Sequence, residues 1–388
     1  MDERTRLIRS ATRRPDRRRT VNPPIERGTT LLNARATDLR DETLGPVYGI
    51  DGGQVHLELR GLLAEMEGAH DTQIVPTGLA AVTLAVLALV RPGDEILVSD
   101  ACYWPSRRFF QRTLARLNVT TRTHAPRASA AEIELLLTSR SRLILMESPG
   151  TATFEVQDVP AICAMAARRG VRTVVDNTWA AGLLFKPLTH GADVSVQALS
   201  KYVSGHSDVF GGAISSRTVE IARQVAITVE DLGVYVSPDD VWLMLRGLRT
   251  LPTRLAQHEI GARRIAEWLQ GRSEVADVLW PALPSSPDHA LWKRDFTGAA
   301  SLMGLILNGG DRRAAEALLD ALDLFGVGFS WGGFESLATY EDAQLGVRTD
   351  SPTLAGPLIR LHIGLEDPAD LIADLERGLM AYTANLSA

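Results

Sequence analysis

The sequence contains only two cysteines, Cys102 and Cys163, among its 388 residues. They form no C-x-x-C motif, which excludes a disulfide framework and most zinc modules, and we expect no metal site. Long apolar runs are lacking too: the longest, residues 79–90, has 12 residues, whereas a helix needs about 20 to cross a bilayer. The first residues also lack the apolar core of a signal peptide. We therefore expect a cytoplasmic protein that has no membrane partner.

Lysine is scarce as well. Of the 41 basic side chains, three are lysines (Lys186, Lys201 and Lys293) and the other 38 are arginines. The net charge of −6 provides no global basic field, so we expect no nucleic-acid partner. No lysine follows a glycine, which excludes the phosphate-binding loop G-x-x-x-x-G-K-[ST]. Because an amine, unlike a guanidinium, can lose its proton and attack a carbonyl, the few lysines are candidates for chemistry.

The composition of the first 55 residues is typical of an arm. Nine arginines lie within the first 27 residues, followed later by the glycine-rich stretch GPVYGIDGG at 45–53, which has Tyr48 in its middle. Such a stretch suits packing against another chain. We interpret residues 1–55 as an N-terminal arm that contacts a neighbouring subunit.

From residue 56 onward, helical patterns alternate with short β-branched runs that are apolar on both faces. This alternation predicts an α/β fold with a mainly parallel sheet covered by helices on both sides. We expect a large domain over 56–250 and a smaller C-terminal α/β domain over 251–388. The clearest expected strands are 95–99, 143–147, 172–177 and 193–199, and the clearest expected helices are 56–67, 77–90, 129–138 and 158–169.

The second half of the chain begins with a long helical pattern. Residues 239–271 predict one long helix that starts after Pro238. After Gly271, three strand-like runs, VADVLWPAL, SLMGLILNGG and PLIRLHIGLED, alternate with helical patterns over 311–322 and 368–383. These elements form the predicted smaller domain.

Three candidate functional features follow predicted strands or open a predicted helix. Asp176 ends a buried strand in VVDNTW, and Lys201 follows the next strand in ALSKYVSGHSDVFGG. Near the start of the large domain, VPTGLAA feeds a helix at Gly78. Ligands of open α/β sheets bind at the carboxyl ends of strands, and helix N-termini present free N–H groups to phosphate. Together these features supply an acid, an amine and an anion site.

Pyridoxal phosphate (PLP) needs those three parts. A lysine amine forms an imine with its aldehyde, a carboxylate keeps its pyridine nitrogen protonated, and backbone amides and hydroxyls hold its phosphate. Asp176 and Lys201 are 25 residues apart, which is the length of one helix and one strand. The spacing alone leaves open a helix-capping aspartate and a surface lysine.

Longer motifs make a resemblance specific. The segments MESPGTATFEVQDVPAI, VVDNTWAAGLLFKPLTHGADVSVQALSKYVSGHSDV, SWGGFESL and LIRLHIGLED follow one another in order. From about residue 20 to the C-terminus, the chain resembles the Cys/Met-metabolism family of PLP-dependent enzymes. The resemblance implies PLP as cofactor and fold type I (aspartate aminotransferase-like), with a seven-stranded type of sheet. It also implies a homo-oligomer, expected to be a dimer of dimers.

The resemblance implies a role for each matching residue. Lys201 would bind the cofactor and later move the substrate Cα proton, Asp176 would pair with the pyridine nitrogen, and Tyr103 would lie over the ring. The resemblance also implies that the cofactor phosphate is bound by Gly78, Leu79, Ser200 and Tyr48 of a neighbouring subunit. It implies that the substrate is bound by Arg360, Ser330, Trp331 and the same tyrosine.

Within this family the sequence is most similar to the carbon–sulfur β-lyases that cleave cystathionine to homocysteine, pyruvate and ammonia in sulfur amino-acid metabolism. Trp331 in FSWGGFES and the motif EVQDVPAI resemble β-lyases. Alternatives are a γ-synthase, γ-lyase or sulfhydrylase of the family, a specialised member of secondary metabolism, and a non-catalytic regulator with the same fold. Retention of the lysine, the aspartate and the other site residues argues against the last.

The arm departs from the family pattern. Family members have an arginine two residues after the arm tyrosine, where this chain has Ile50. A charged hydrogen bond of that kind is worth about 1.5–3 kcal/mol. The resemblance therefore implies weaker holding of the phosphate unless another arginine replaces this contact.

Overall fold

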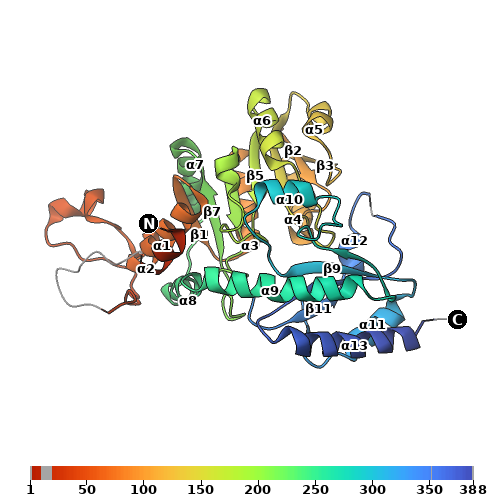
Figure 1. Cartoon of the computed structure of the whole chain (residues 1–388). Helices are drawn as coiled ribbons and strands as arrows, with labels where there is room; N and C mark the ends of the chain where they lie inside the picture. Colours follow the sequence, from red (N-terminus) through yellow and green to blue (C-terminus); the bar gives the residue numbers. More distant parts are fainter. Residues whose placement is uncertain (1, 10–19, 351, 387–388) are drawn as a thin grey trace.

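The computed structural model describes residues 2–9, 20–350 and 352–386. Two sheets organise this part of the chain, a seven-stranded sheet between residues 71 and 216 and a five-stranded sheet between residues 275 and 362 (Figure 1). Helix α9 (Leu251–Gln270) lies between them. The larger and smaller α/β units thus match the prediction, while their boundaries at 55/56 and 250/251 remain predictions.

The larger sheet is mainly parallel, as the sequence predicts. Its strand order is β1-β7-β6-β5-β4-β2-β3, and within it only β7 runs antiparallel to its neighbours. Three of its strands, β1, β3 and β7, were not predicted from the apolar runs. The strands are β1 (Asp71–Val75), β2 (Glu95–Ser99), β3 (Thr120–His124), β4 (Ser141–Glu147), β5 (Arg172–Asp176), β6 (Val194–Gln197) and β7 (Gly212–Ser216).

Helices cover both faces of this sheet, which explains why its strands are apolar on both sides. Successive residues of β5 illustrate the alternation: Val174 packs into a cluster with α3 (Gly78–Leu89) and α7 (Val219–Asp231). Val175 packs into the other cluster, with α2 (Gln54–Glu67) and α6 (Val159–Arg169). The second cluster continues through α9 into the smaller sheet, so one apolar core joins both units.

The remaining elements complete the two units. In the smaller sheet the strand order is β10-β11-β12-β9-β8. Its strands are β8 (Val275–Leu279), β9 (Leu302–Leu307), β10 (Gly326–Val327), β11 (Leu337–Tyr340) and β12 (Leu358–His362). The other helices are α1 (Glu3–Arg9), α4 (Trp104–Phe109), α5 (Ala130–Leu136), α8 (Pro238–Leu248), α10 (His289–Asp295), α11 (Arg312–Asp320), α12 (Asp342–Leu345) and α13 (Pro368–Ala384).

The prediction of one long helix over 239–271 is wrong. The chain forms α8 up to Leu248 and starts α9 at Leu251, with a break at Thr250. Pro252 in the first turn of α9 explains the break, because proline has no N–H for a continuing helix and its ring clashes with the preceding turn. At the break the carbonyl of Gly247 accepts the N–H of Thr250 at 3.1 Å and also the guanidinium of Arg254 at 2.8 Å.

Residues 20–53 form an arm that extends away from both sheets (Figure 1). It contains only short 3-10 turns, at Ala36–Arg40, Glu42–Leu44 and Gly49–Asp51. Arg27 Nε donates to Asp239 Oδ2 of α8 at 2.9 Å and ties the arm to the body. Among the described residues, none of the helices combines the length and apolar character needed to span a membrane.

A buried carboxylate joins α13 to the rest of the smaller unit. Asp374 is fully buried, and it accepts the backbone N–H groups of Asp323, Leu324 and Phe325 at 2.9, 2.8 and 3.1 Å. These donors lie in the connection between α11 and β10. The carboxylate therefore supplies hydrogen bonds that this irregular backbone cannot make by itself.

We predict that Asp374→Ala lowers the free energy of unfolding by about 2–4 kcal/mol, because it removes a buried carboxylate that three backbone N–H groups share, that of the buried Phe325 among them. Urea unfolding followed by circular dichroism measures the change. The control is Asp370→Ala on the exposed side of α13, which should cost less than about 1 kcal/mol. Equal losses in the two variants would contradict the role of Asp374.

Candidate active site

Asp176 ends β5 at the carboxyl edge of the larger sheet. Its carboxylate accepts the backbone N–H of Thr178 at 3.0 Å and the hydroxyl of Thr178 at 2.5 Å. The Thr178 hydroxyl in turn accepts the N–H of Ala198 at 2.9 Å, which links Asp176 to the segment leading to Lys201. Burial raises the pKa of Asp176, although the bonds from Thr178 oppose the shift. Sequence reasoning did not single out Thr178.

Lys201 lies in the turn that follows β6, where its N–H bonds to the carbonyl of Ala198 at 3.1 Å. Its Nζ donates to Ser330 Oγ at 2.9 Å and lies 5.2 Å from the centre of the Trp331 ring. Burial, and then the positive charge of Arg360, lower the pKa of Lys201 to about 8. A larger fraction of this amine is therefore neutral near pH 7 than for an exposed lysine, which makes it a better nucleophile and base.

Arg360 reaches the same place from β12. Its Nη2 donates to the carbonyl of Ser330 at 3.4 Å, and its Nε lies 3.4 Å from Glu341 Oε1. Burial lowers the pKa of Arg360, while the carboxylate of Glu341 opposes the shift. The structure thus brings together Lys201, Ser330, Trp331 and Arg360, which sequence analysis had selected from three separate segments.

Tyr103 stands at the start of α4, and its backbone N–H donates to Glu147 Oε2 at 2.7 Å. Burial, and then the negative charge of Glu147, raise the pKa of Tyr103, so its hydroxyl keeps its proton at neutral pH. Glu147 ends β4 directly opposite Asp176 in the register of the sheet, and it also accepts the hydroxyl of Thr151. Sequence reasoning missed Glu147. Alignment of the two strand ends was the signal that could have found it.

The predicted phosphate residues meet at the N-terminus of α3. Thr77 caps this helix by accepting the N–H of Ala80 at 3.0 Å, whereas the N–H groups of the first helical residues have no partner within the helix. A Cβ at Gly78 would lie 2.4 Å from the Cβ of Ala198, so only glycine allows this close packing. Ser200 Oγ accepts the N–H of Gly211 at 2.9 Å. The helix start and the segment before Lys201 therefore lie against each other.

Tyr48 is the predicted residue that the single chain does not bring to this place. It is half-exposed and belongs to the arm of residues 20–53, which extends away from both sheets (Figure 1). The carboxylate of Asp51 accepts the N–H groups of Val47 and Tyr48 at 3.1 and 2.9 Å, so it is engaged with its own turn. Ile50 beside it is also partly exposed.

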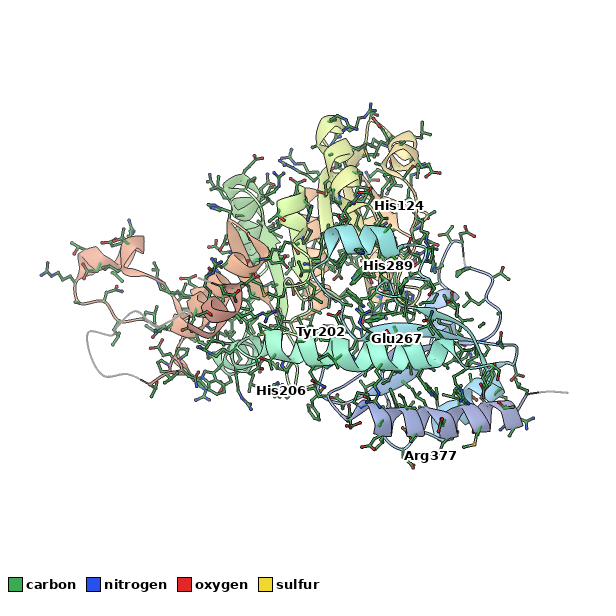
Figure 2. The ribbon with its side chains drawn as sticks, in the orientation of Figure 1. His124, Tyr202, His206, Glu267, His289 and Arg377 are labelled. Carbon is green, nitrogen blue, oxygen red and sulfur yellow. The ribbon has the colours of Figure 1, made fainter. Side chains whose placement is uncertain are left out.

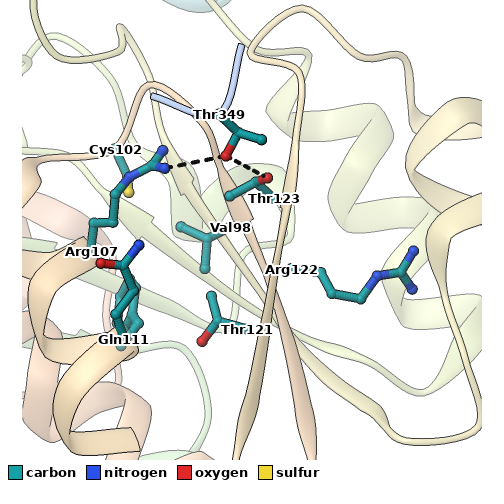
Figure 3. A pocket seen from close by; sticks show the side chains of 9 residues that line it. Val98, Cys102, Arg107, Gln111, Thr121, Arg122, Thr123 and Thr349 are labelled. Atoms are coloured by element: carbon teal, nitrogen blue, oxygen red, sulfur yellow. Dashed lines mark hydrogen bonds between the residues drawn. The ribbon is translucent and has the colours of Figure 1, made fainter. Parts of the chain in front are cut away.

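A polar clamp attaches the segment before β12 to the larger unit, and in Figure 3 the hydroxyl of Thr349 lies between Arg107 and Thr123. Asp100 accepts Arg107 Nη2 at 2.6 Å and the N–H groups of Thr349 and Asp350 at 3.0 Å each. Because Arg107 belongs to α4, the clamp supports the helix that starts at Tyr103. A cavity of about 410 Å³ opens beside the clamp, and none of the predicted site residues line it; its lining residues are Val98, Cys102, Arg107, Phe110, Gln111, Thr121, Arg122, Thr123 and Thr349.

The residues at the sheet edge fit PLP. Asp176 is a partly buried carboxylate that pairs with no cationic side chain among the described residues, which suits a protonated ring nitrogen. Lys201 is a buried amine whose contacts are a hydroxyl, an indole and a nearby guanidinium, which suits an aldehyde. The start of α3 packs against the Lys201 segment and offers unpaired N–H groups to a phosphate.

Comparison with known proteins agrees with this geometry. The relatives include a putative cystathionine β-lyase of Rhizobium johnstonii, 46% identical over 372 residues (94% of this chain, 92% of the relative). Cystathionine β-lyase MetC of Escherichia coli is 40% identical over 376 residues (92% and 93%). The crystal structure of cystathionine γ-synthase from Xanthomonas oryzae pv. oryzae in complex with cystathionine has a TM-score of 0.91 and 32% identity and covers 100% of both chains.

The match to that solved structure confirms the expected fold type I. The family model for the "Cys/Met metabolism PLP-dependent enzyme" matches residues 4–380. The chain therefore belongs to the Cys/Met-metabolism family of PLP-dependent enzymes.

Proposed function

We propose that this protein is a PLP-dependent carbon–sulfur β-lyase whose main substrate is cystathionine. The observation that carries the proposal is the buried Lys201 amine, bonded to Ser330 and close to Arg360, at the sheet edge where Asp176 ends β5. The two relatives named cystathionine β-lyases support the substrate. With one water, cystathionine would give homocysteine, pyruvate and ammonia.

When bound, PLP supplies a ring that accepts the electron pair left on the substrate Cα when its proton departs. Asp176, held by Thr178, would bind the protonated ring nitrogen and stabilise its charge. The N–H groups of Gly78 and Leu79 and the hydroxyl of Ser200 would bind the phosphate. Tyr103, half-exposed at the start of α4, would cover the ring and exclude water from one side.

The remaining residues would bind the substrate and move protons. Arg360 would bind the α-carboxylate with its guanidinium fork, assisted by the hydroxyl of Ser330. Lys201 would remove the Cα proton, since its lowered pKa makes a neutral amine available. The Tyr103 hydroxyl, which keeps its proton because burial and the charge of Glu147 raise its pKa, would give a proton to the departing sulfur.

The arm supports a homo-oligomer in which Tyr48 completes the site of a neighbouring subunit. Val21, Leu32 and Leu44 of the arm are 82%, 95% and 65% exposed, respectively, which is unfavourable for apolar side chains unless another surface covers them. We propose that a second copy of the chain covers them and that two such dimers associate. The cytoplasmic location remains a prediction.

The second candidate function is γ-chemistry, as in a cystathionine γ-synthase. The similarity to the solved γ-synthase favours it, because that protein shares the fold over its whole length. Trp331, whose ring centre lies 5.2 Å from the Lys201 amine, belongs to the motif that resembles β-lyases, and this supports the β-lyase. A specialised member with another sulfur substrate would use the same machinery.

The first prediction separates these candidates by product. We expect the enzyme to form pyruvate from cystathionine, because β-elimination leaves a three-carbon fragment, while γ-elimination would give 2-oxobutyrate. Lactate dehydrogenase and chromatography of the oxo acids identify the product, with O-acyl homoserine as the competing substrate. Faster turnover of O-acyl homoserine, or 2-oxobutyrate as the main product, would show that the β-lyase proposal is wrong.

The second prediction concerns the pH dependence of cofactor uptake. Apo-enzyme should take up PLP faster as the pH rises to about 8 and then level off, because only the neutral Lys201 amine attacks the aldehyde. Arg360→Gln should move the midpoint to higher pH, since the nearby positive charge lowers the pKa of Lys201. Stopped-flow absorbance of the bound cofactor measures the rate. The surface variant Arg263→Gln is the control, and an identical midpoint in all three proteins would contradict the prediction.

The third prediction tests the shared site. Lys201→Ala and Tyr48→Ala should each be nearly inactive alone, yet mixing unfolded chains and refolding them together should restore activity. Random pairing gives about a quarter of the sites an intact lysine and an intact partner tyrosine. Pyruvate release from cystathionine measures the recovery. Mixtures no more active than the two single variants would mean that Tyr48 does not act across subunits.

A further inference from the structure

The turn that carries Ser330 and Trp331 is packed onto the backbone of Lys201. Gly332 in this turn has a φ of +87°, and a Cβ there would lie 2.7 Å from the backbone N of Tyr202 and 2.8 Å from the carbonyl carbon of Lys201. Glycine is therefore required for both the conformation and the close approach. The placement of this turn determines where the Ser330 hydroxyl and the Trp331 ring contact the Lys201 amine.

Strand β12 holds the turn at two points. Arg360 and His362 are two residues apart, so both side chains lie on the same face of the strand. Arg360 bonds to the carbonyl of Ser330 at the beginning of the turn. His362 Nε2 accepts the N–H of Gly332 at 3.1 Å and lies 3.1 Å from the carbonyl oxygen of Gly333.

A buried hydrogen-bond chain connects His362 back to the neighbour of Lys201. Ser301 Oγ lies 3.1 Å from His362 Nδ1 and 3.2 Å from the hydroxyl oxygen of Tyr202. The N–H of Ser301 donates to that same tyrosine oxygen at 3.1 Å. Tyr202 is next to Lys201 in the chain, and its ring lies inside the molecule beside α9 (Figure 2). The contacts thus form a closed circuit around the Lys201 turn.

Burial keeps the imidazole of His362 in its neutral form. The exposed fractions of Tyr202, Ser301 and His362 are 0%, 0% and 1%. Burial, and then the neighbouring His258, lower the pKa of His362 to about 3, so the imidazole stays neutral at working pH. A neutral imidazole has one acceptor and one donor nitrogen. With the proton on Nδ1, the ring accepts the N–H of Gly332 at Nε2 and donates to Ser301 at Nδ1, and Nε2 then makes no hydrogen bond to the carbonyl of Gly333.

His258 provides a comparison within the same cluster. Its ring lies 5.4 Å from that of His362 and 5.4 Å from that of Tyr202, and it is equally buried. Its Nδ1 bonds to the carbonyl of Ile363 at 2.8 Å, whereas no hydrogen-bond partner for its Nε2, in the Gly332 turn or elsewhere, is found among the described residues. His258 therefore has the surroundings of His362 without its bond to the turn.

We propose that His362 is a positioning residue for the reaction: through the Tyr202–Ser301–His362 chain it holds the Ser330–Gly333 turn so that Ser330 and Trp331 keep the Lys201 amine in place. The assignment rests on the proposed function for the role of Lys201. A bulky apolar residue at position 362 would fill the space but leave the Gly332 N–H and the Ser301 hydroxyl unpaired. The turn, and with it the surroundings of the amine, would then shift.

The test compares His362→Leu with His258→Leu as holoenzymes. In His362→Leu the pH midpoint of the visible band of the lysine-bound cofactor, measured without substrate, should shift by about half a unit or more. The kcat for cystathionine should fall about tenfold or more, with KM changed less. His258→Leu should lose comparable thermal stability while both the band midpoint and kcat stay near those of the parent.

Two further variants keep the result decisive. His362→Gln retains an acceptor and a donor and should recover much of the kcat, and Ser301→Ala breaks the chain even if His362→Leu does not fold. If both His362→Leu and Ser301→Ala match His258→Leu in band midpoint and kcat, His362 is an ordinary core residue and the inference is wrong. The band titration needs no lyase activity. A parent enzyme that releases no pyruvate would therefore refute the proposed function without deciding this one.

Discussion

The Lys201 amine is buried against a hydroxyl, an indole ring and a guanidinium, and no carboxylate among the described residues neutralises it. Burying a charged ammonium in such a place is costly, so the pKa of Lys201 falls to about 8 and a larger fraction of the amine is neutral near pH 7 than for an exposed lysine. The surrounding structure maintains this condition. Gly332 allows the covering turn to reach the lysine backbone, and β12 brings both Arg360 and His362 to that turn.

Adjacent parallel strands of the larger sheet place two acidic side chains at the same edge. Asp176 and Glu147 end adjacent strands in register, and burial, followed by the nearby charge of Asp176, raises the pKa of Glu147. Glu147 accepts the N–H of Tyr103, and the Asp100–Arg107 clamp holds the helix that begins there. The two carboxylates therefore lie side by side at this edge, while Arg360 reaches the site from β12 through the carbonyl of Ser330.

Much of this arrangement was predictable from the chain alone. Asp176, Lys201 and the start of α3 were visible as an acid, an amine and a helix N-terminus at the ends of apolar strands, and long motifs identified the family. The break at Thr250 was also encoded locally, by Pro252, although the helical periodicity on both sides concealed it. Thr178 was missed although it bonds to Asp176 only two residues away, because a threonine after a strand has many ordinary roles. Glu147 was missed because its place opposite Asp176 depends on the pairing of two strands, which only an alignment of the strand ends could have indicated.

The sequence by itself determined the kinds of groups available and the local elements that carry them, because apolar periodicity, capping residues and glycines act over a few neighbouring positions. Only the tertiary structure decided which groups meet. The contacts of Lys201 with Ser330, and of Gly332 with His362, join residues separated by 129 and 30 positions. Such contacts depend on how the two sheets pack around α9. That packing is determined by apolar side chains from the whole core, so no single stretch of sequence predicts it.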